Sequence, residues 1–98
     1  MDILFAHQNF PGQFRHSATA LAADKGNRVL ALGVNPQGYP TPGVAYGRYP
    51  IRRKPAEVAP LIVDFQSKVI RGEASAAAAS ALKDKGFEPD VIVVHPGW

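Results

Sequence analysis

Apolar residues gather in four short runs that predict buried β-strands. The runs cover residues 2–6 (DILFA), 28–33 (RVLALG), 44–49 (VAYGRY) and 90–95 (DVIVVH). The first, second and fourth are nearly continuous rather than alternating, which is typical of parallel strands covered on both faces. The third run follows a loop rich in proline and glycine at residues 35–43 (NPQGYPTPG).

Two segments between these runs have helical periodicity. From Gln13 to Lys25 the apolar residues recur at helical spacing, and Gly26 predicts the end of the helix. A longer periodic segment runs from Pro60 to Lys85, with Gly86 and Pro89 after it. At 1.5 Å per residue this helix is about 39 Å long, twice a typical strand, so it must overhang the sheet or bend, with Gly72 as the favoured bend. Its alanine-rich part at 75–81 predicts close packing on the sheet.

The alternation of strands and helices predicts an α/β domain. We expect about four mostly parallel strands in the order 3-2-1-4 with two main helices, the second very long. The direction of the third strand stays open, because residues 35–43 are few for a parallel crossover. The fourth strand would lack cover on one face and a neighbour along one edge. We therefore expect a truncated domain that associates with itself through this edge or face.

Composition and charge restrict the functional classes. The chain has 98 residues, enough for one domain, and a net charge of +3. Only Arg52, Arg53 and Lys54 form a basic run, which favours a solvated loop over nucleic-acid binding. There is no cysteine, which fits a reducing cytoplasm, and the sequence has no apolar stretch of membrane-spanning length. The sequence predicts a protein that is soluble or at most peripheral to a membrane.

Two polar segments follow predicted strands. Residues 7–16 (HQNFPGQFRH) follow the first strand and residues 95–98 end the fourth, so they would meet where the strand order reverses. Gly12 beside a helix start lets the backbone approach a phosphate, or it merely completes a turn. His7 and His95 could bind a ligand or act in acid–base catalysis, or they fix loops. Trp98 could stack on a sugar, whereas burial is favoured for Phe10.

Several kinds of chemistry find no support in the motifs. The spacing of His7, His16 and His95 matches no metal-ligand signature, and His16 is favoured as a surface residue. There is neither a serine nucleophile elbow nor a phosphate-binding P-loop. A self-sufficient hydrolase is therefore not supported.

Three segments together carry a family resemblance. Residues 1–32, the VIRGEA motif at 69–74 and GFEPDVIVVHPGW at 86–98 resemble the N-terminal domain of family 4 (group 1) glycosyltransferases, which have the two-domain GT-B architecture. The resemblance implies that residues 1–98 are a truncated, acceptor-side, Rossmann-like domain. It implies retaining transfer of a hexose from a nucleotide-sugar to an unknown acceptor, without a metal or another cofactor.

The resemblance also implies roles for particular residues. Gly12 and Gln13 stand where the family usually has a Gly-Gly pair that meets the donor diphosphate, with Gln13 in place of the second glycine. The resemblance also implies that His7, Asn9, His95 and Trp98 line the acceptor side of the site. The family's catalytic histidine and paired glutamates lie beyond this sequence, so we assign no catalytic residue and expect the 98-residue chain alone to be inactive.

Two other readings of the same pattern stay open. One is a flavodoxin-like binding or regulatory module without catalysis, which would use the same loops for a phosphate ligand. The other is a purely structural interaction domain, suggested by the uncovered fourth strand.

Overall fold

Four strands and two main helices form the domain, as the sequence predicts. The computed structural model describes residues 1–37, 39–50 and 60–94, with side chains from residue 68 onward in the last range. A short 3-10 turn, η1, precedes the first helix. The elements are β1 (Asp2–Ala6), η1 (Gly12–Phe14), α1 (Arg15–Ala23), β2 (Arg28–Gly33), β3 (Val44–Arg48), α2 (Pro60–Asp84) and β4 (Val91–Val94).

All four strands are parallel and lie in the order β3-β2-β1-β4. This confirms the predicted order. It also answers the open question of β3, which pairs parallel to β2 from Val29–Val44 to Gly33–Arg48. The carboxyl ends of the four strands consequently share one edge of the sheet.

The parallel connection from β2 to β3 contains no helix among its described residues, 34–37 and 39–43. It packs against α1, since a β-carbon on Gly43 would lie 3.2 Å from that of Ala22. Gly43 has φ +81, a conformation that favours glycine. Within the loop Thr41 is buried, and its hydroxyl accepts a hydrogen bond from the side chain of Gln37. The loop therefore takes the place of a crossover helix.

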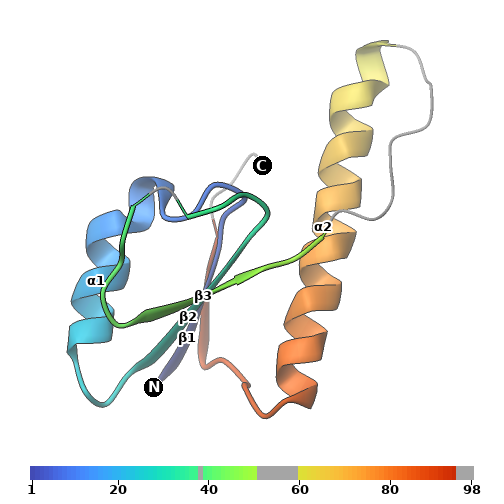
Figure 1. Ribbon diagram of the computed structural model, residues 1–98. Coiled ribbons are helices and arrows are strands. Elements are labelled where there is room, and N and C mark those ends of the chain that lie inside the picture. The colour runs from blue at the N-terminus through green and yellow to red at the C-terminus, as the bar shows by residue number, and fades with distance from the viewer. Residues whose placement is uncertain (38, 51–59, 95–98) are drawn as a thin grey trace.

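The sheet has a hydrophobic cluster on each face because strand side chains alternate. Ile3 and Phe5 point toward α1, whereas Leu4 points toward α2, and Figure 1 shows the two helices on opposite sides of the sheet. The α1 cluster comprises Ile3, Phe5, Phe10, Phe14, Ala18, Val29 and Ala31. The α2 cluster comprises Leu4, Leu32, Tyr49 and Phe87, with Ala74, Ala78, Ala79 and Leu82 packed against it.

The second half of α2 packs on the sheet and its first half runs past it. Figure 1 shows the beginning of this continuous helix beyond the carboxyl ends of the strands, so it overhangs the sheet. The alanines of the second half lie close to the sheet, as expected. Gly86, with φ +94, ends the helix, and the N–H of Phe87 donates to the carbonyl of Leu82 at 2.9 Å. This hydrogen bond and the contact of the two side chains form a Schellman motif.

The first helix ends slightly earlier than its pattern predicts. It stops at Ala23 rather than Lys25, because Asp24 leaves the helical conformation and its carboxylate accepts the N–H of Gly26 at 2.9 Å. The Asn27 amide also donates to the carbonyl of Leu21 at 3.0 Å. Side-chain capping therefore fixes this end, with Gly26 in the following turn.

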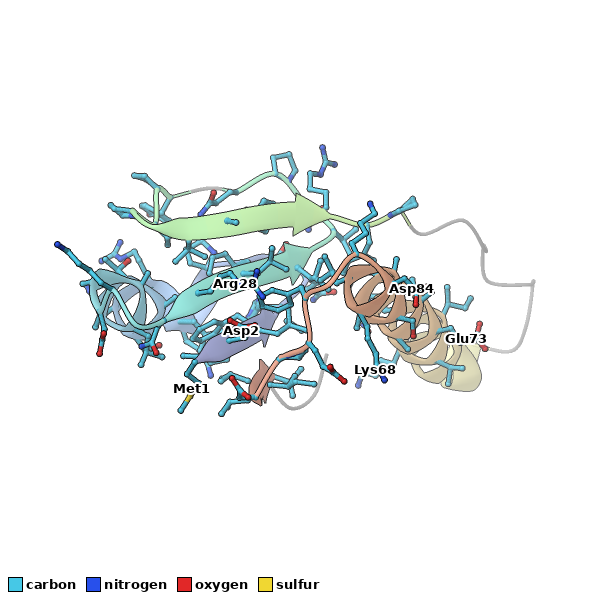
Figure 2. The ribbon with its side chains drawn as sticks, turned by 90° about the horizontal axis from the view of Figure 1, so that it is seen from below. Met1, Asp2, Arg28, Lys68, Glu73 and Asp84 are labelled. Carbon is cyan, nitrogen blue, oxygen red and sulfur yellow. The ribbon has the colours of Figure 1, made fainter. Side chains whose placement is uncertain are left out.

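Charged side chains hold the strands together at the amino-terminal edge of the sheet. Arg28 binds the Asp2 carboxylate through two hydrogen bonds, of 3.1 and 2.6 Å, and Figure 2 shows the two residues side by side. Asp90 accepts the N–H of Asp2 at 2.7 Å and so fastens the start of β4. The hydrogen bond from Arg28 lowers the pKa of Asp2 and, in return, raises that of Arg28.

The edge strand β4 leaves apolar side chains in solvent. Val91, Ile92 and Val94 are 43%, 57% and 46% exposed, whereas Val93 packs on the α1 cluster. Within the described residues, β4 has β1 as its only neighbour. The prediction of an uncovered fourth strand is therefore confirmed.

Candidate functional site

The loop between β1 and α1 is anchored at the carboxyl edge of the sheet. The N–H of His7 donates to Leu32 of β2 at 3.1 Å, and the carbonyl of His7 accepts the N–H of Phe10 at the same distance. Phe10 is 1% exposed and stacks on Tyr46 with a centroid distance of 5.8 Å. The burial predicted for Phe10 is confirmed, and it fixes the path of the loop.

His7 and Gly12 are in close contact within this loop. Gly12 has φ +48, and a β-carbon placed on it would lie 2.8 Å from Nε2 of His7. The N–H of Asn9 donates to Nδ1 of His7 at 3.0 Å, so the neutral imidazole carries its proton on Nε2. The ring also meets Phe14 edge to face at 5.9 Å. Glycine is therefore required at position 12 by both backbone conformation and space.

The end of β2 supports the same loop from the other side. The N–H groups of Val34 and Asn35 both donate to the carbonyl of Gln8 at 3.1 Å. The Asn35 side chain donates to the side-chain oxygen of Asn9. The backbone carbonyl of Asn35 accepts a hydrogen bond from the hydroxyl of Tyr46. Burial raises the pKa of Tyr46, which keeps this hydroxyl protonated as a donor.

A cavity of about 260 Å³ opens beside Gly12. It is lined by Asn9, Pro11, Gly12, Arg15, Pro36 and Tyr39. The guanidinium of Arg15 lies 5.0 Å from the centre of the Tyr39 ring. The amide of Asn9, the Arg15 cation and the accessible backbone at Gly12 give the cavity the chemistry for binding an anionic group.

The residues singled out from the sequence fall into three groups. His7, Asn9 and Gly12 come together, the first two through the hydrogen bond to Nδ1. Gln13 is exposed in η1, outside the residues that line the cavity, and His16 is exposed on α1. The expectations for His95, Trp98 and the basic run at 52–54 lie outside the described residues.

Sequence reasoning missed several residues of this region. Arg15, Asn35, Tyr39 and Tyr46 enter it only through the fold, because the irregular β2–β3 connection brings the last three beside the β1–α1 loop. One available signal was Arg15, a cation three residues after the glycine in the first turn of a helix. Its position there could have suggested anion binding.

The described part of the chain holds neither a cluster of metal ligands nor a membrane-spanning helix. Among residues 1–37, 39–50 and 60–94, no three histidine or carboxylate side chains gather as a metal site would need. None of the helices described there combines the length and apolarity of a membrane span.

The fold and the site define the class of the protein. A parallel sheet of order 3-2-1-4 with polar loops at its carboxyl edge is a Rossmann-like arrangement that binds ligands at that edge. A family model described as "Glycosyl transferase family 4 group" matches residues 25–98. The chain therefore belongs to this family of glycosyltransferases. Searches of curated proteins and of solved structures each returned no match.

Family membership confirms the resemblance found in the sequence. The matched residues begin at Lys25, after the β1–α1 loop and α1. The roles of Gly12, Gln13, His7 and Asn9 therefore depend on the geometry and on the resemblance of the first 24 residues.

Proposed function

We propose that this chain is the acceptor-side N-terminal domain of a retaining glycosyltransferase. It would act with a second domain to transfer a hexose from a nucleotide-sugar to an acceptor. The diphosphate of the donor would meet Gly12 and Gln13, while His7, Asn9, His95 and Trp98 would face the acceptor. The family supports glycosyl transfer, and the loop geometry supports the position of the donor.

The observation that carries this proposal is the conformation of Gly12 beside a cavity with a cation. A phosphate oxygen can come close to the backbone at a residue without a side chain. Arg15 supplies a positive charge in the same cavity, and Asn9 supplies an amide donor. A diphosphate carries the negative charge that this set of groups would stabilise.

The pair of His7 and Gly12 gives the acceptor proposal a chemical basis. Because Nδ1 of His7 accepts the Asn9 N–H, the imidazole ring is held in a fixed orientation beside Gly12. This geometry suits binding and orientation of a substrate.

A calorimetric titration with a panel of nucleotide-sugars tests the proposal. We expect one of them to bind, and Gly12→Ala to weaken that binding at least about tenfold through the lost backbone approach. Gly86→Ala is the matched control, since Gly86 also has a positive φ but lies at the opposite edge of the sheet with open space around it. Equal effects of the two substitutions, or no binding by any nucleotide-sugar, would contradict the proposal.

We also propose that the protein associates with itself through the surface of β4. The exposed Val91, Ile92 and Val94 on an edge strand support this, because such edges template pairing with another chain. A second copy offers the same strand, which allows a symmetric contact.

A further inference from the structure

A second cavity at the carboxyl edge lies on the α2 side of the sheet. Its volume is about 10 Å³, and it is lined by Ala6, His7, Gln8, Tyr49, Arg71 and Ser75. These residues come from the end of β1, the residue after β3, and the middle of α2. The volume is close to that of a single water-sized sphere, so the cavity has room for one oxygen atom.

Arg71 has a buried donor in this cavity without an acceptor. Within the part of the chain that the structure describes, Nε of Arg71 is the buried side-chain polar atom that makes no hydrogen bond. A buried N–H of a charged group is costly without a partner, and native proteins satisfy nearly all such groups. The cavity beside it therefore needs an occupant that accepts a hydrogen bond.

Two hydroxyl groups lie close to Arg71. Tyr49 is 8% exposed, and burial raises its pKa, whereas the neighbouring Ser75 hydroxyl lowers it by less. The Ser75 hydroxyl donates its proton to the carbonyl of Gly72 at 3.1 Å, so Tyr49 is the hydroxyl that can donate to a ligand here. The positive charge of Arg71 also lowers the pKa of Tyr49. The raised pKa keeps the Tyr49 hydroxyl protonated, so it can donate a hydrogen bond alongside Arg71.

Described carboxylates are distributed unevenly between the two edges of the sheet, whereas cations lie at both edges. Arg15, Arg48 and Arg71 lie at the carboxyl edge, at the start of α1, the end of β3 and the cavity next to β1. Most described carboxylates are instead at the amino edge, where Asp2, Asp24, Asp84, Glu88 and Asp90 lie at element ends or in the connecting turns.

Glu73 is the exception on α2. It follows Arg71 by two residues and so points about 200° away around the helix, into an apolar groove lined by Tyr49 and the alanines of α2. Figure 2 shows Glu73 on α2 at a distance from Asp2 and Arg28 at the amino edge. The carboxyl edge next to Arg71 is therefore suited to an anion.

We propose that Arg71, with the hydroxyl of Tyr49, binds one oxygen of an oxyanion carried by the acceptor. One oxygen would enter the small cavity. The remainder of the group would lie near Arg48 in the neighbouring cavity of about 360 Å³, which shares Tyr49 as a wall. This inference rests on the proposed glycosyl transfer and adds that the acceptor is anionic, with a phosphate or a carboxylate.

Titration of the purified protein with inorganic phosphate at fixed ionic strength, with acetate in a parallel series, tests this inference. We expect Arg71→Met to weaken binding of the preferred anion about tenfold or more, as expected for loss of a charged hydrogen bond. Arg71→Lys should recover part of the affinity, because it restores the charge but not the planar donor. Lys83→Met is the control on the same helix, since Lys83 is an exposed cation at the other end, and its effect should stay within about twofold.

Three outcomes would overturn the inference. Affinity for both anions unchanged in Arg71→Met would mean that the cavity holds water alone. Loss of binding in Arg15→Met but not in Arg71→Met would place the anion in the cavity beside Gly12. If Arg71→Met fails to fold by circular dichroism, Tyr49→Phe carries the test, and unchanged affinity in that variant would contradict the proposal.

The test of the anionic acceptor and the test of the proposed donor function can fail independently of each other. Binding of a nucleotide-sugar without any dependence of anion affinity on Arg71 would remove only the inference about the acceptor. Anion binding that depends on Arg71, with no nucleotide-sugar bound, would remove only the proposed donor function.

Discussion

The imidazole of His7 occupies the space that a side chain at Gly12 would need, with Nε2 only 2.8 Å from the position of a β-carbon. Two residues that are five positions apart in the loop therefore depend on each other. The absence of a side chain at one permits the position of the ring at the other. This dependence can be measured.

Gly12→Ala should lower the free energy of unfolding by about 1–2 kcal/mol from the left-handed backbone alone, with a further loss from contact with His7. In the double variant Gly12→Ala/His7→Ala the contact is absent, so the two substitutions should be non-additive. Urea unfolding of the wild type, the two single variants and the double variant measures the coupling free energy between His7 and Gly12. Additive free energies would show that His7 moves aside without cost.

Phe10→Ala should destabilise the protein by about 3–5 kcal/mol, because this buried ring packs between Phe5 and Tyr46. Phe10→Leu retains much of the apolar volume and should cost less. Thermal and urea unfolding of both variants tests the anchoring of the loop. A Phe10→Ala variant as stable as Phe10→Leu would show that the apolar volume of Phe10 does not anchor the loop.

Asp2 should make stability depend on pH in acid. The Arg28 hydrogen bond lowers the pKa of Asp2 below 3.8, so its stabilising contribution is present above that value and is lost as the pH falls through the folded pKa. The difference in urea midpoint between wild type and Asp2→Asn should therefore be constant above about pH 5 and shrink toward pH 2. A difference that does not change over this range would exclude the ion pair as its source.

Ile92→Lys should reduce self-association, since it places a charge on the exposed surface of β4. Sedimentation velocity over a range of concentrations should show a larger monomer fraction than for wild type. Leu21→Lys, at a 37% exposed position on α1, serves as the control. A wild-type protein that stays monomeric at high concentration would refute association.

The purified 98-residue chain should not turn over a nucleotide-sugar. Retaining transfer in the proposed architecture needs groups from a second domain, and the residues proposed for the donor and acceptor include no assigned catalytic group. Release of the nucleoside diphosphate from the donor, followed by chromatography, is the measurement. Turnover by this chain alone would disprove the division of labour between two domains.

The sequence predicted the strands, their order and both helices because continuous apolar runs and helical periodicity are local signals. The direction of β3 could not be obtained in this way. It depends on whether a short loop can return along the sheet, and here the packing of Gly43 on Ala22 permits it. The side-chain cap at Asp24 likewise ended α1 before the glycine that the pattern favoured.

The candidate site was predicted only where its residues belong to one loop. His7, Asn9 and Gly12 lie close in sequence, whereas Asn35 and Tyr46 join them through tertiary contacts. Arg71 did leave a signal that was missed. It precedes Ala74 and Ala78 by three and seven residues, so it falls on the stripe of α2 that packs on the sheet, where an arginine is unusual.

The overhang of α2 extends the protein beyond the carboxyl ends of the strands. From Pro60 to Arg71 the helix extends for about 16 Å, and Figure 1 shows its beginning standing beyond the carboxyl ends of the strands. A molecule approaching the sheet from this side meets the flank of a helix before it meets a strand end. Among the described residues, the flank of α2 from Pro60 to Arg71 therefore forms one side of the space beyond the carboxyl ends of the strands.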